Sequence, residues 1–138
     1  MDFRKVGLAV IQGGRILLCR KNNGLPYLIL PGGKANPGES SLDCLHREIQ
    51  EELGPVTATN LRYFGTYTSP AAVAPGAPPA IIEIELYLGE LIGEPIASGE
   101  IAQLIWFDLS GDRALLAPSL ANLIVPDLSA LSRRHDTV

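Results

Sequence analysis

Three glutamates that stand close together in the sequence are the residues best suited to do chemistry. Glu48, Glu51 and Glu52 are spaced i, i+3 and i+4, so on a helix their carboxylates project from one face. Like charges placed in this way repel by roughly 0.2–0.5 kcal/mol per pair on an isolated helix. A bound cation would remove this repulsion, and Mg²⁺ prefers oxygen ligands that it shares with substrate phosphates. The spacing therefore predicts a divalent-metal site for phosphate chemistry.

A helix must position these carboxylates, and the flanking residues indicate where it begins and ends. The Gly-Glu-Ser segment at 38–40 supplies turn and capping chemistry, so the helix should begin near residue 40 or 41. Gly54 suits the position after the last turn, and Pro55 cannot continue the helix. An apolar stripe with spacings of 3, 4 and 4 should face a sheet, and its members are Leu42, Leu45, Ile49 and Leu53. The three glutamates lie off this stripe.

The loop and helix together resemble the Nudix box, whose pattern is G-x5-E-x7-R-E-U-x-E-E-x-G-U with U aliphatic. The box covers residues 33–55, and the matching residues are Gly33, Glu39, Arg47, Glu48, Ile49, Glu51, Glu52 and Gly54. Pro55 departs from the pattern at the final aliphatic position, beyond the helix end. This many correctly spaced positions make the resemblance specific.

The resemblance implies an enzyme that hydrolyses a nucleoside diphosphate linked to another group, using Mg²⁺ or Mn²⁺. It implies that Glu51 and Glu52 ligate the metal and that Glu48 either ligates it or holds the attacking water. The backbone carbonyl of Gly32 would complete the coordination, because glycine lets the main chain approach closely. Arg47 would pair with a box glutamate such as Glu48 and keep it ionised and oriented.

Four further residues are candidates for the site, and three of them have two possible roles. Lys34 could help to bind substrate or be a solvated loop lysine, and Arg20 is a second candidate for holding a terminal phosphate. Glu100 could supply a further metal ligand or the general base, or be an idle exposed carboxylate. Glu39 could stabilise the junction of loop and helix, or simply cap the helix.

The rest of the chain reads as an α/β protein. Strands are expected at 3–12 and 15–20, joined as a hairpin by Gly13-Gly14, and further strands at 27–30, 61–68, 81–88, 90–96 and 103–107. The segment 69–80 is an uncharged loop, and a second helix near 118–131 should be interrupted or restarted at Pro126. These elements agree with the Nudix fold, an α/β/α sandwich around a mixed β-sheet.

Composition limits the remaining possibilities. The chain has 138 residues and a net charge of −4, so we expect a single domain over 1–138, with 133–138 as a frayed tail. Without a basic run, a nucleic-acid polymer is not an expected partner. The first apolar run is too short for a signal-peptide core or a membrane span, which favours a cytoplasmic protein, monomeric or homodimeric. Cys19 and Cys44 should be reduced and structural.

The substrate is the least constrained prediction. Residues 67–70, Tyr-Thr-Ser-Pro, resemble the Tyr-x-Ser-Pro of ADP-ribose pyrophosphatases, whereas the short chain resembles nucleoside triphosphate pyrophosphohydrolases. We expect a (d)NTP that yields monophosphate and pyrophosphate. The alternatives are an ADP-ribose or nucleotide-sugar pyrophosphatase, a nucleotide-binding sensor module, which would be expected to lose box glutamates, and an RNA-processing relative.

Overall fold

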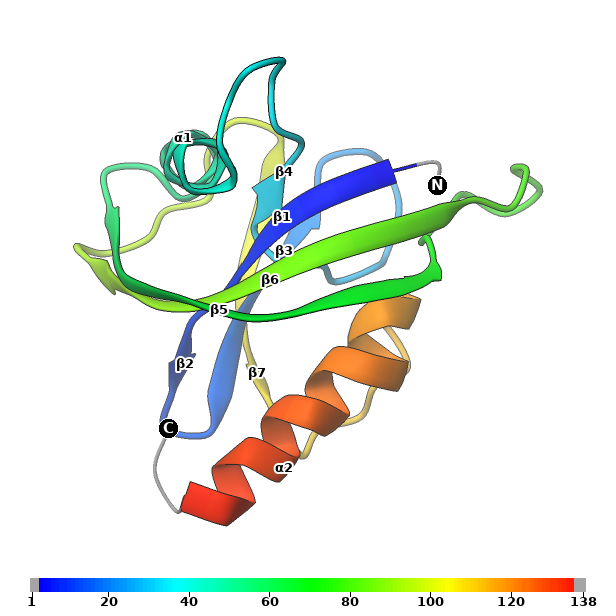
Figure 1. The fold of residues 1–138 in the computed structure, drawn as a ribbon. Coiled ribbons are helices and arrows are strands. Elements are labelled where there is room, and N and C mark those ends of the chain that lie inside the picture. Colours follow the sequence, from blue (N-terminus) through cyan, green and yellow to red (C-terminus); the bar gives the residue numbers. More distant parts are fainter. Residues whose placement is uncertain (1–2, 136–138) are drawn as a thin grey trace.

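The architecture comes from a computed structural model, which describes the backbone of residues 3–135 and the side chains of residues 3–131. Two β-sheets lie at the centre, and one helix packs on either side of them (Figure 1). In the described residues, no helix is long and apolar enough to cross a membrane. The arrangement is the expected α/β/α sandwich.

The larger sheet is mixed and has the strand order β4-β1-β6-β5. Its strands are β1 (Phe3–Ala9), β4 (Gly32–Gly33), β5 (Thr57–Pro70) and β6 (Ile81–Ile92). β1 runs parallel to β6, whereas β4 pairs antiparallel with β1 and β5 antiparallel with β6. The parallel pair of β1 and β6 brings the N-terminal strand to the middle of the sheet, directly beside the start of the Nudix box.

The smaller sheet contains β2 (Ile11–Gln12), β3 (Arg15–Lys21) and β7 (Ile101–Asp108), in that order. The Gly13-Gly14 hairpin is present, since Ile11 pairs with Ile16. However, the single strand expected at 3–12 is broken at Val10. Its first part belongs to the larger sheet and its last two residues to the smaller one, so this segment links the two sheets.

Two other expected strands differ from the structure. Residues 27–30 form only isolated bridges, at Leu28 and Ile29, because their neighbours on the two sides are different segments of the chain. Residues 90–92 are not a partner of the preceding strand but its continuation, since β6 runs unbroken to Ile92 and ends before Gly93, whose φ is 103°. The expected strands at 61–68, 81–88 and 103–107 lie within β5, β6 and β7.

Helix α1 (Ser41–Leu53) carries the box carboxylates, and its buried face belongs to a core cluster that also contains Val6, Leu8 and Leu17 of strands β1 and β3. Its N-cap is Ser40, whose hydroxyl accepts a hydrogen bond from the Asp43 N–H at 3.1 Å. The predicted apolar stripe is confirmed at three positions but wrong at Leu42, which is 44% exposed. Cys44 is buried instead.

The C-terminal helix packs on the opposite side of the sheets (Figure 1). A π-helical turn, η1 (Leu120–Ile124), leads directly into α2 (Val125–His135). Pro126 is the second residue of α2, so the helical run continues through it, and the change from π-helix to α-helix falls directly before it. Residues 133–135, expected to fray, are helical, and residues 136–138 lie outside the described part of the chain.

Gly32 in β4 allows a backbone approach that no other residue could make. Its φ is 138°, and a Cβ at this position would collide with the carbonyl oxygen of Val6 in β1. By contrast, Gly13 also has a positive φ, of 57°, but a Cβ there would meet nothing within 4 Å. Substitutions at the two glycines can therefore distinguish the free-energy cost of the backbone conformation from the cost of a steric clash.

We expect Gly32→Ala to lower the free energy of unfolding much more than Gly13→Ala. A left-handed conformation costs a non-glycine residue about 1–2 kcal/mol, and both variants carry such a cost. The collision with Val6 should add roughly 1–3 kcal/mol at Gly32 only. Urea denaturation of the two variants and the wild type measures the difference. Equal losses would show that β4 can move away from β1 without penalty.

Candidate active site

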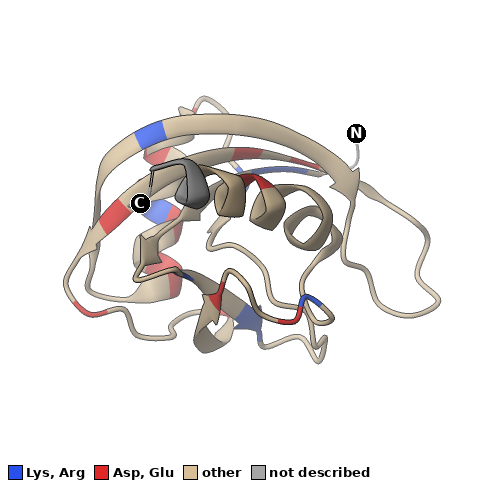
Figure 2. Cartoon of the chain, turned by 90° about the horizontal axis from the view of Figure 1, so that it is seen from below, with Lys and Arg blue, Asp and Glu red and all other residues tan. Residues whose placement is uncertain are grey.

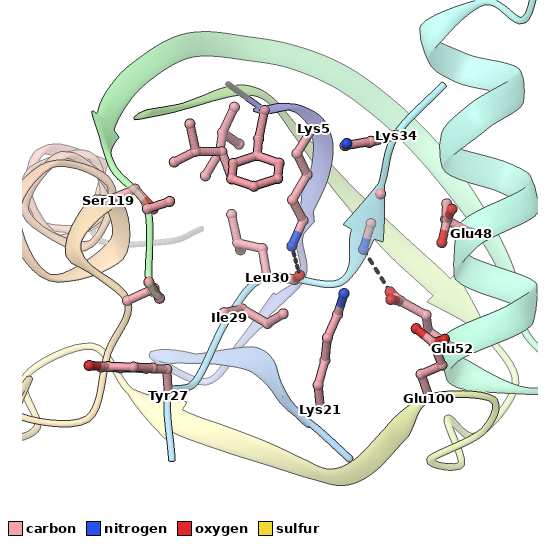
Figure 3. A pocket seen from close by; sticks show the side chains of 18 of the residues that line it. Lys5, Lys21, Tyr27, Ile29, Leu30, Lys34, Glu48, Glu52, Glu100 and Ser119 are labelled. Carbon is pink, nitrogen blue, oxygen red and sulfur yellow. Dashed lines mark hydrogen bonds between the residues drawn. The ribbon is translucent and has the colours of Figure 1, made fainter. Parts of the chain in front are cut away.

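Helix α1 and strand β4 open onto a cavity of about 820 Å³ whose walls differ in chemistry (Figure 3). One wall is acidic and is formed by Glu48, Glu51, Glu52 and Glu100. The other end is largely apolar and includes Tyr27, Ile29, Leu30, Ile82, Ile84 and Leu120. Lysine side chains lie between the two, so the cavity can hold a ligand that is apolar at one end and anionic at the other.

Glu52 is the most buried of these carboxylates. Its residue is only 7% exposed, although it lies off the apolar stripe of α1. The N–H of Gly32 donates a hydrogen bond of 2.8 Å to its Oε1. Burial raises the pKa of Glu52, against the opposing effects of Lys5 and the Gly32 N–H. Glu52 has no cationic side chain within 4.0 Å in the described structure.

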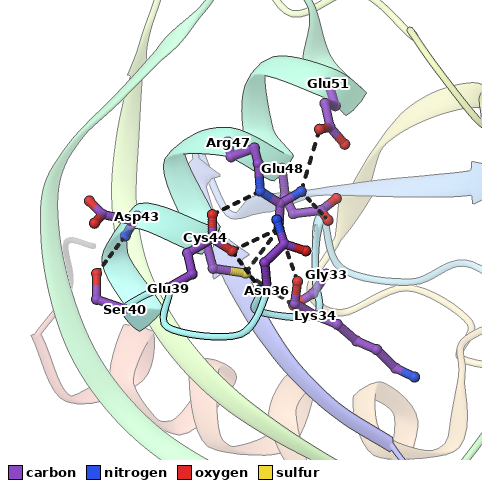
Figure 4. Close-up of polar contacts among 10 residues, drawn as sticks. All are labelled: Gly33, Lys34, Asn36, Glu39, Ser40, Asp43, Cys44, Arg47, Glu48 and Glu51. Carbon is purple, nitrogen blue, oxygen red and sulfur yellow. Dashed lines mark hydrogen bonds and ion pairs between the residues drawn. The ribbon is translucent and has the colours of Figure 1, made fainter.

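Arg47 binds the box carboxylates together (Figure 4). Its Nε and Nη2 donate to the two oxygens of Glu39, both at 2.9 Å, and its Nη1 donates to Glu48 at 3.0 Å and to Glu51 at 3.4 Å. The expected pairing with Glu48 is present, but the two-point partner is Glu39. Glu39 is therefore not the helix cap, and its bond to Arg47 lowers its pKa to about 2.

The same arginine fixes the loop that precedes α1. Arg47 Nη2 donates to the carbonyl oxygen of Lys34 at 3.0 Å, and the N–H of Asn36 donates to Glu39 at 2.9 Å. Gly33 lies against Glu48, because a Cβ on Gly33 would collide with the Glu48 carboxyl group. Loop and helix are thus held so that the Glu48 carboxylate rests on the backbone at the cavity wall.

The donor set fits a divalent cation. Three carboxylates on one helical face supply the oxygen ligands that Mg²⁺ and Mn²⁺ prefer, and the nearly buried Glu52 lacks a counter-charge within 4.0 Å in the part of the chain described. In the described part of the chain, no three or more acidic, histidine or cysteine side chains are already close enough together to bind a metal ion. Glu51, whose side chain is 57% exposed, would have to turn inward.

The other predicted site residues separate into two groups. Glu100 and Lys34 line the cavity, with the Lys34 ammonium 5.0 Å from the centre of the Phe3 ring. Arg20 does not line the cavity, because its guanidinium donates to the carbonyl of Pro26 at 3.2 Å and to the side chain of Gln103. The structure therefore gives Arg20 no contact with this site.

Sequence reasoning missed two lysines of the site, Lys5 and Lys21. Both line the cavity, and Lys5 Nζ donates to the carbonyl oxygen of Leu30 at 2.6 Å. Burial lowers the pKa of Lys5, whereas the nearby carboxylates of Glu52 and Glu48 act in the opposite direction. The local sequence carried no signal for Lys5, because it follows Arg4 at the start of a strand, and charged residues there are usually exposed.

Comparison with known proteins identifies the class of enzyme to which this site belongs. The family model described as NUDIX domain matches residues 1–122, so the chain belongs to the Nudix hydrolase family. Members of this family act on pyrophosphate bonds of nucleotide compounds and generally use divalent metal cations. The resemblance and the fold expected from the box are both confirmed.

Individual relatives and solved structures agree with this assignment. The chain is 35% identical over 102 residues to the NAD-capped RNA hydrolase NudC of Pseudomonas putida (strain W619). That match covers 72% of this chain but only 34% of NudC, so it spans about a third of that protein. The fold is also similar to the solution structure of the E. coli ORF135 protein, with a TM-score of 0.72, 25% identity, and coverage of 98% of this chain and 94% of that one.

A crystal structure of a MutT NUDIX hydrolase from Burkholderia pseudomallei has the same fold. The TM-score is 0.72 at 24% identity, and the match covers 92% of this chain and 97% of the other. At this identity the similarity concerns the fold alone.

We expect Glu52→Gln to lower kcat by at least about a hundredfold, which is roughly 2.7 kcal/mol of barrier. The substitution keeps the shape and the acceptor for the Gly32 N–H but removes one charge from the acidic wall. Glu100→Ala should cost clearly less. Steady-state kinetics of the two variants, with folding checked by circular dichroism, test both statements. Near wild-type turnover by a folded Glu52→Gln variant would contradict the assignment of Glu52 as a metal ligand. An equal loss of kcat in Glu100→Ala would favour Glu100 as the general base.

Replacing Arg47 by lysine should not be conservative, because lysine lacks the planar fork that reaches both oxygens of Glu39. Hydrogen bonds to charged groups are worth about 1.5–3 kcal/mol each, so we expect activity and Mn²⁺ affinity to fall together by roughly ten- to a hundredfold. Calorimetric titration with Mn²⁺ alongside kinetics measures both. Unchanged metal affinity combined with a raised KM would instead place Arg47 on the substrate.

Proposed function

We propose that this Nudix hydrolase is a nucleoside triphosphate pyrophosphohydrolase that uses Mg²⁺ or Mn²⁺ and releases a monophosphate and pyrophosphate. The observation that carries the proposal is that one cavity combines an acidic wall, a lysine-lined middle and an apolar end. A nucleotide has the same sequence of parts, because its base is flat and largely apolar and its phosphates are anionic. The single-domain organisation, cytoplasmic location and monomeric or homodimeric state stay predictions from the sequence.

At the acidic wall, Glu48, Glu51 and Glu52, with the Gly32 carbonyl, would hold the metal. A divalent cation bound there would neutralise charge on the pyrophosphate oxygens and so favour attack by water. Arg47 would keep Glu48 oriented, since it donates a hydrogen bond of 3.0 Å to that carboxylate. Either Glu48 or Glu100 would accept the proton from the attacking water.

The apolar end would hold the base. Its lining includes Ala71 and Ala72 from the loop between β5 and β6, and this loop carries no charged residue, as Figure 2 shows. Ser119 and Tyr27 bring hydroxyl groups to the same end (Figure 3). Ser119 is 3% exposed and, in the described structure, its hydroxyl makes no hydrogen bond to the protein. These hydroxyls could contact polar atoms of the base or sugar.

The Tyr-x-Ser-Pro motif has a structural explanation that weakens the case for ADP-ribose. The hydroxyl of Tyr67 donates to Asp127 at 2.9 Å and so links β5 to α2, while Ser69 is buried and bonds to the carbonyl of Pro70. Neither side chain lines the cavity. These packing contacts therefore explain the motif without a role in binding a second sugar.

A dinucleotide substrate is the second candidate. Its support is the relative named as an NAD-capped RNA hydrolase, because NAD also contains a pyrophosphate bond between two nucleosides. A sensor module is disfavoured, since every box glutamate is present and four carboxylates line the cavity.

A panel of canonical and oxidised dNTPs, NTPs, ADP-ribose, NAD, sugar nucleotides and dinucleoside polyphosphates should rank a (d)NTP first by kcat/KM. Identification of the products should give pyrophosphate and a monophosphate, and activity should vanish with EDTA and return with Mg²⁺ or Mn²⁺. If NAD heads the panel, the triphosphate proposal is wrong and the dinucleotide alternative is favoured. If ADP-ribose heads it, the triphosphate proposal is also wrong and the ADP-ribose pyrophosphatase alternative is favoured.

A further inference from the structure

The positive charges of the cavity differ in how they are paired. In the described part of the chain, Arg4 and Arg47 are the only cationic side chains that form ion pairs within 4.0 Å. Three lysines that line the cavity, Lys5, Lys21 and Lys34, have no carboxylate at that distance. A charged group that is withdrawn from water is normally paired, because the loss of hydration is otherwise uncompensated. Lys34 is exposed and keeps its hydration, whereas Lys5 and Lys21 are partly buried, which indicates that an anionic ligand supplies the charge that pairs with them.

Lys5 is the lysine whose position is most closely defined. It is partly buried in β1, and its ammonium donates one hydrogen bond, to the carbonyl oxygen of Leu30. An ammonium group has three donors, and no other hydrogen bond of Lys5 occurs among the residues described. Its remaining donors are thus available to a ligand.

The place of Lys5 along the cavity suggests which part of a ligand it meets. Leu30 lies two residues before Gly32, whose N–H holds Glu52 on the acidic wall. Figure 3 shows the Lys5 ammonium beside Leu30, between the carboxylates of α1 and the apolar end with Tyr27 and Ser119. A group that reaches Lys5 therefore lies between the base-binding end and the metal-binding wall.

We propose that Lys5 binds the phosphate attached to the nucleoside, the group that remains on the monophosphate product. This inference rests on the proposed function, in that the base occupies the apolar end and the bond to be hydrolysed lies at the acidic wall. In that orientation the phosphate next to the sugar is the first anionic group that Lys5 meets. Lys21, which lines the same part of the cavity, would add to the positive potential there.

The test measures binding without metal or hydrolysis. In EDTA, calorimetry gives the Kd of AMP and dGMP and of the matching nucleosides, adenosine and deoxyguanosine, which lack the phosphate. We expect the wild type to bind at least one monophosphate more tightly than its nucleoside. Lys5→Met should weaken that monophosphate by at least about tenfold, the effect of losing one charged hydrogen bond, and leave the nucleoside within about twofold.

Two further variants separate charge from structure. Lys5→Gln keeps a donor that could reach the Leu30 carbonyl but removes the charge. It should therefore show the same loss of monophosphate binding, and it replaces Lys5→Met in the test if Lys5→Met folds poorly. Lys5→Arg keeps the charge and should recover much of the preference for the monophosphate. Arg15→Met is the matched control, because Arg15 is exposed at the other end of β3, about 20 Å along the strand from Lys21. It should change neither Kd.

The proposal is overturned if Lys5→Gln binds monophosphate as the wild type does, or if monophosphate and nucleoside weaken equally, which would indicate a purely structural role at Leu30. It is also overturned if the wild type shows no preference for the monophosphate. Because both nucleoside triphosphates and ADP-ribose contain a nucleoside phosphate, a failure of the triphosphate proposal in the substrate panel leaves this result unaffected, and the reverse also holds.

Discussion

The crowding of negative charge on helix α1 is the constraint on which the rest of the site depends. Glu48, Glu51 and Glu52 repel one another, and Glu52 is also withdrawn from water. Two groups of the protein bind these three carboxylates. Arg47 holds Glu48 and Glu51 while its other side is fixed on Glu39, and the backbone N–H of Gly32 holds Glu52. These contacts orient the carboxylates but leave Glu52, among the residues described, without a cationic side chain within 4.0 Å, and a bound metal would supply that charge.

The position of β4 explains why the loop before the helix contains two adjacent glycines. Gly32 lies so close to β1 that a Cβ would overlap the Val6 carbonyl, and Gly33 lies so close to α1 that a Cβ would overlap the Glu48 carboxyl group. One glycine therefore fits the loop to the sheet and the other fits it to the helix. Together they place a backbone N–H and a carboxylate side by side, which neither a flexible loop nor a regular strand would do with the same precision.

The box helix could be predicted from local sequence because its signals are local. The cap at Ser40, the stop at Gly54 and most of the apolar stripe depend only on neighbouring residues. The errors occur where a distant segment decides the outcome. Leu42 is exposed and Glu52 buried because β4 packs on one side of the helix, and the expected strand at 3–12 divides because two sheets meet at Val10. Lys5 was missed for the same reason, since only β4 and the following helix turn its strand position into a cavity wall.

Family membership and substrate choice rest on different parts of the molecule. The acidic wall, Arg47 and the two glycines form the part of the site that we propose acts on the pyrophosphate bond, which a nucleoside triphosphate and NAD share. Discrimination must come from groups that meet what lies beyond that bond. In this chain the groups that we propose for this role are the uncharged loop between β5 and β6, the hydroxyls of Ser119 and Tyr27, and the lysines in the middle of the cavity. Since unpaired lysines favour ligands with more negative charge, their number supports a triphosphate over a dinucleotide that carries only two phosphates.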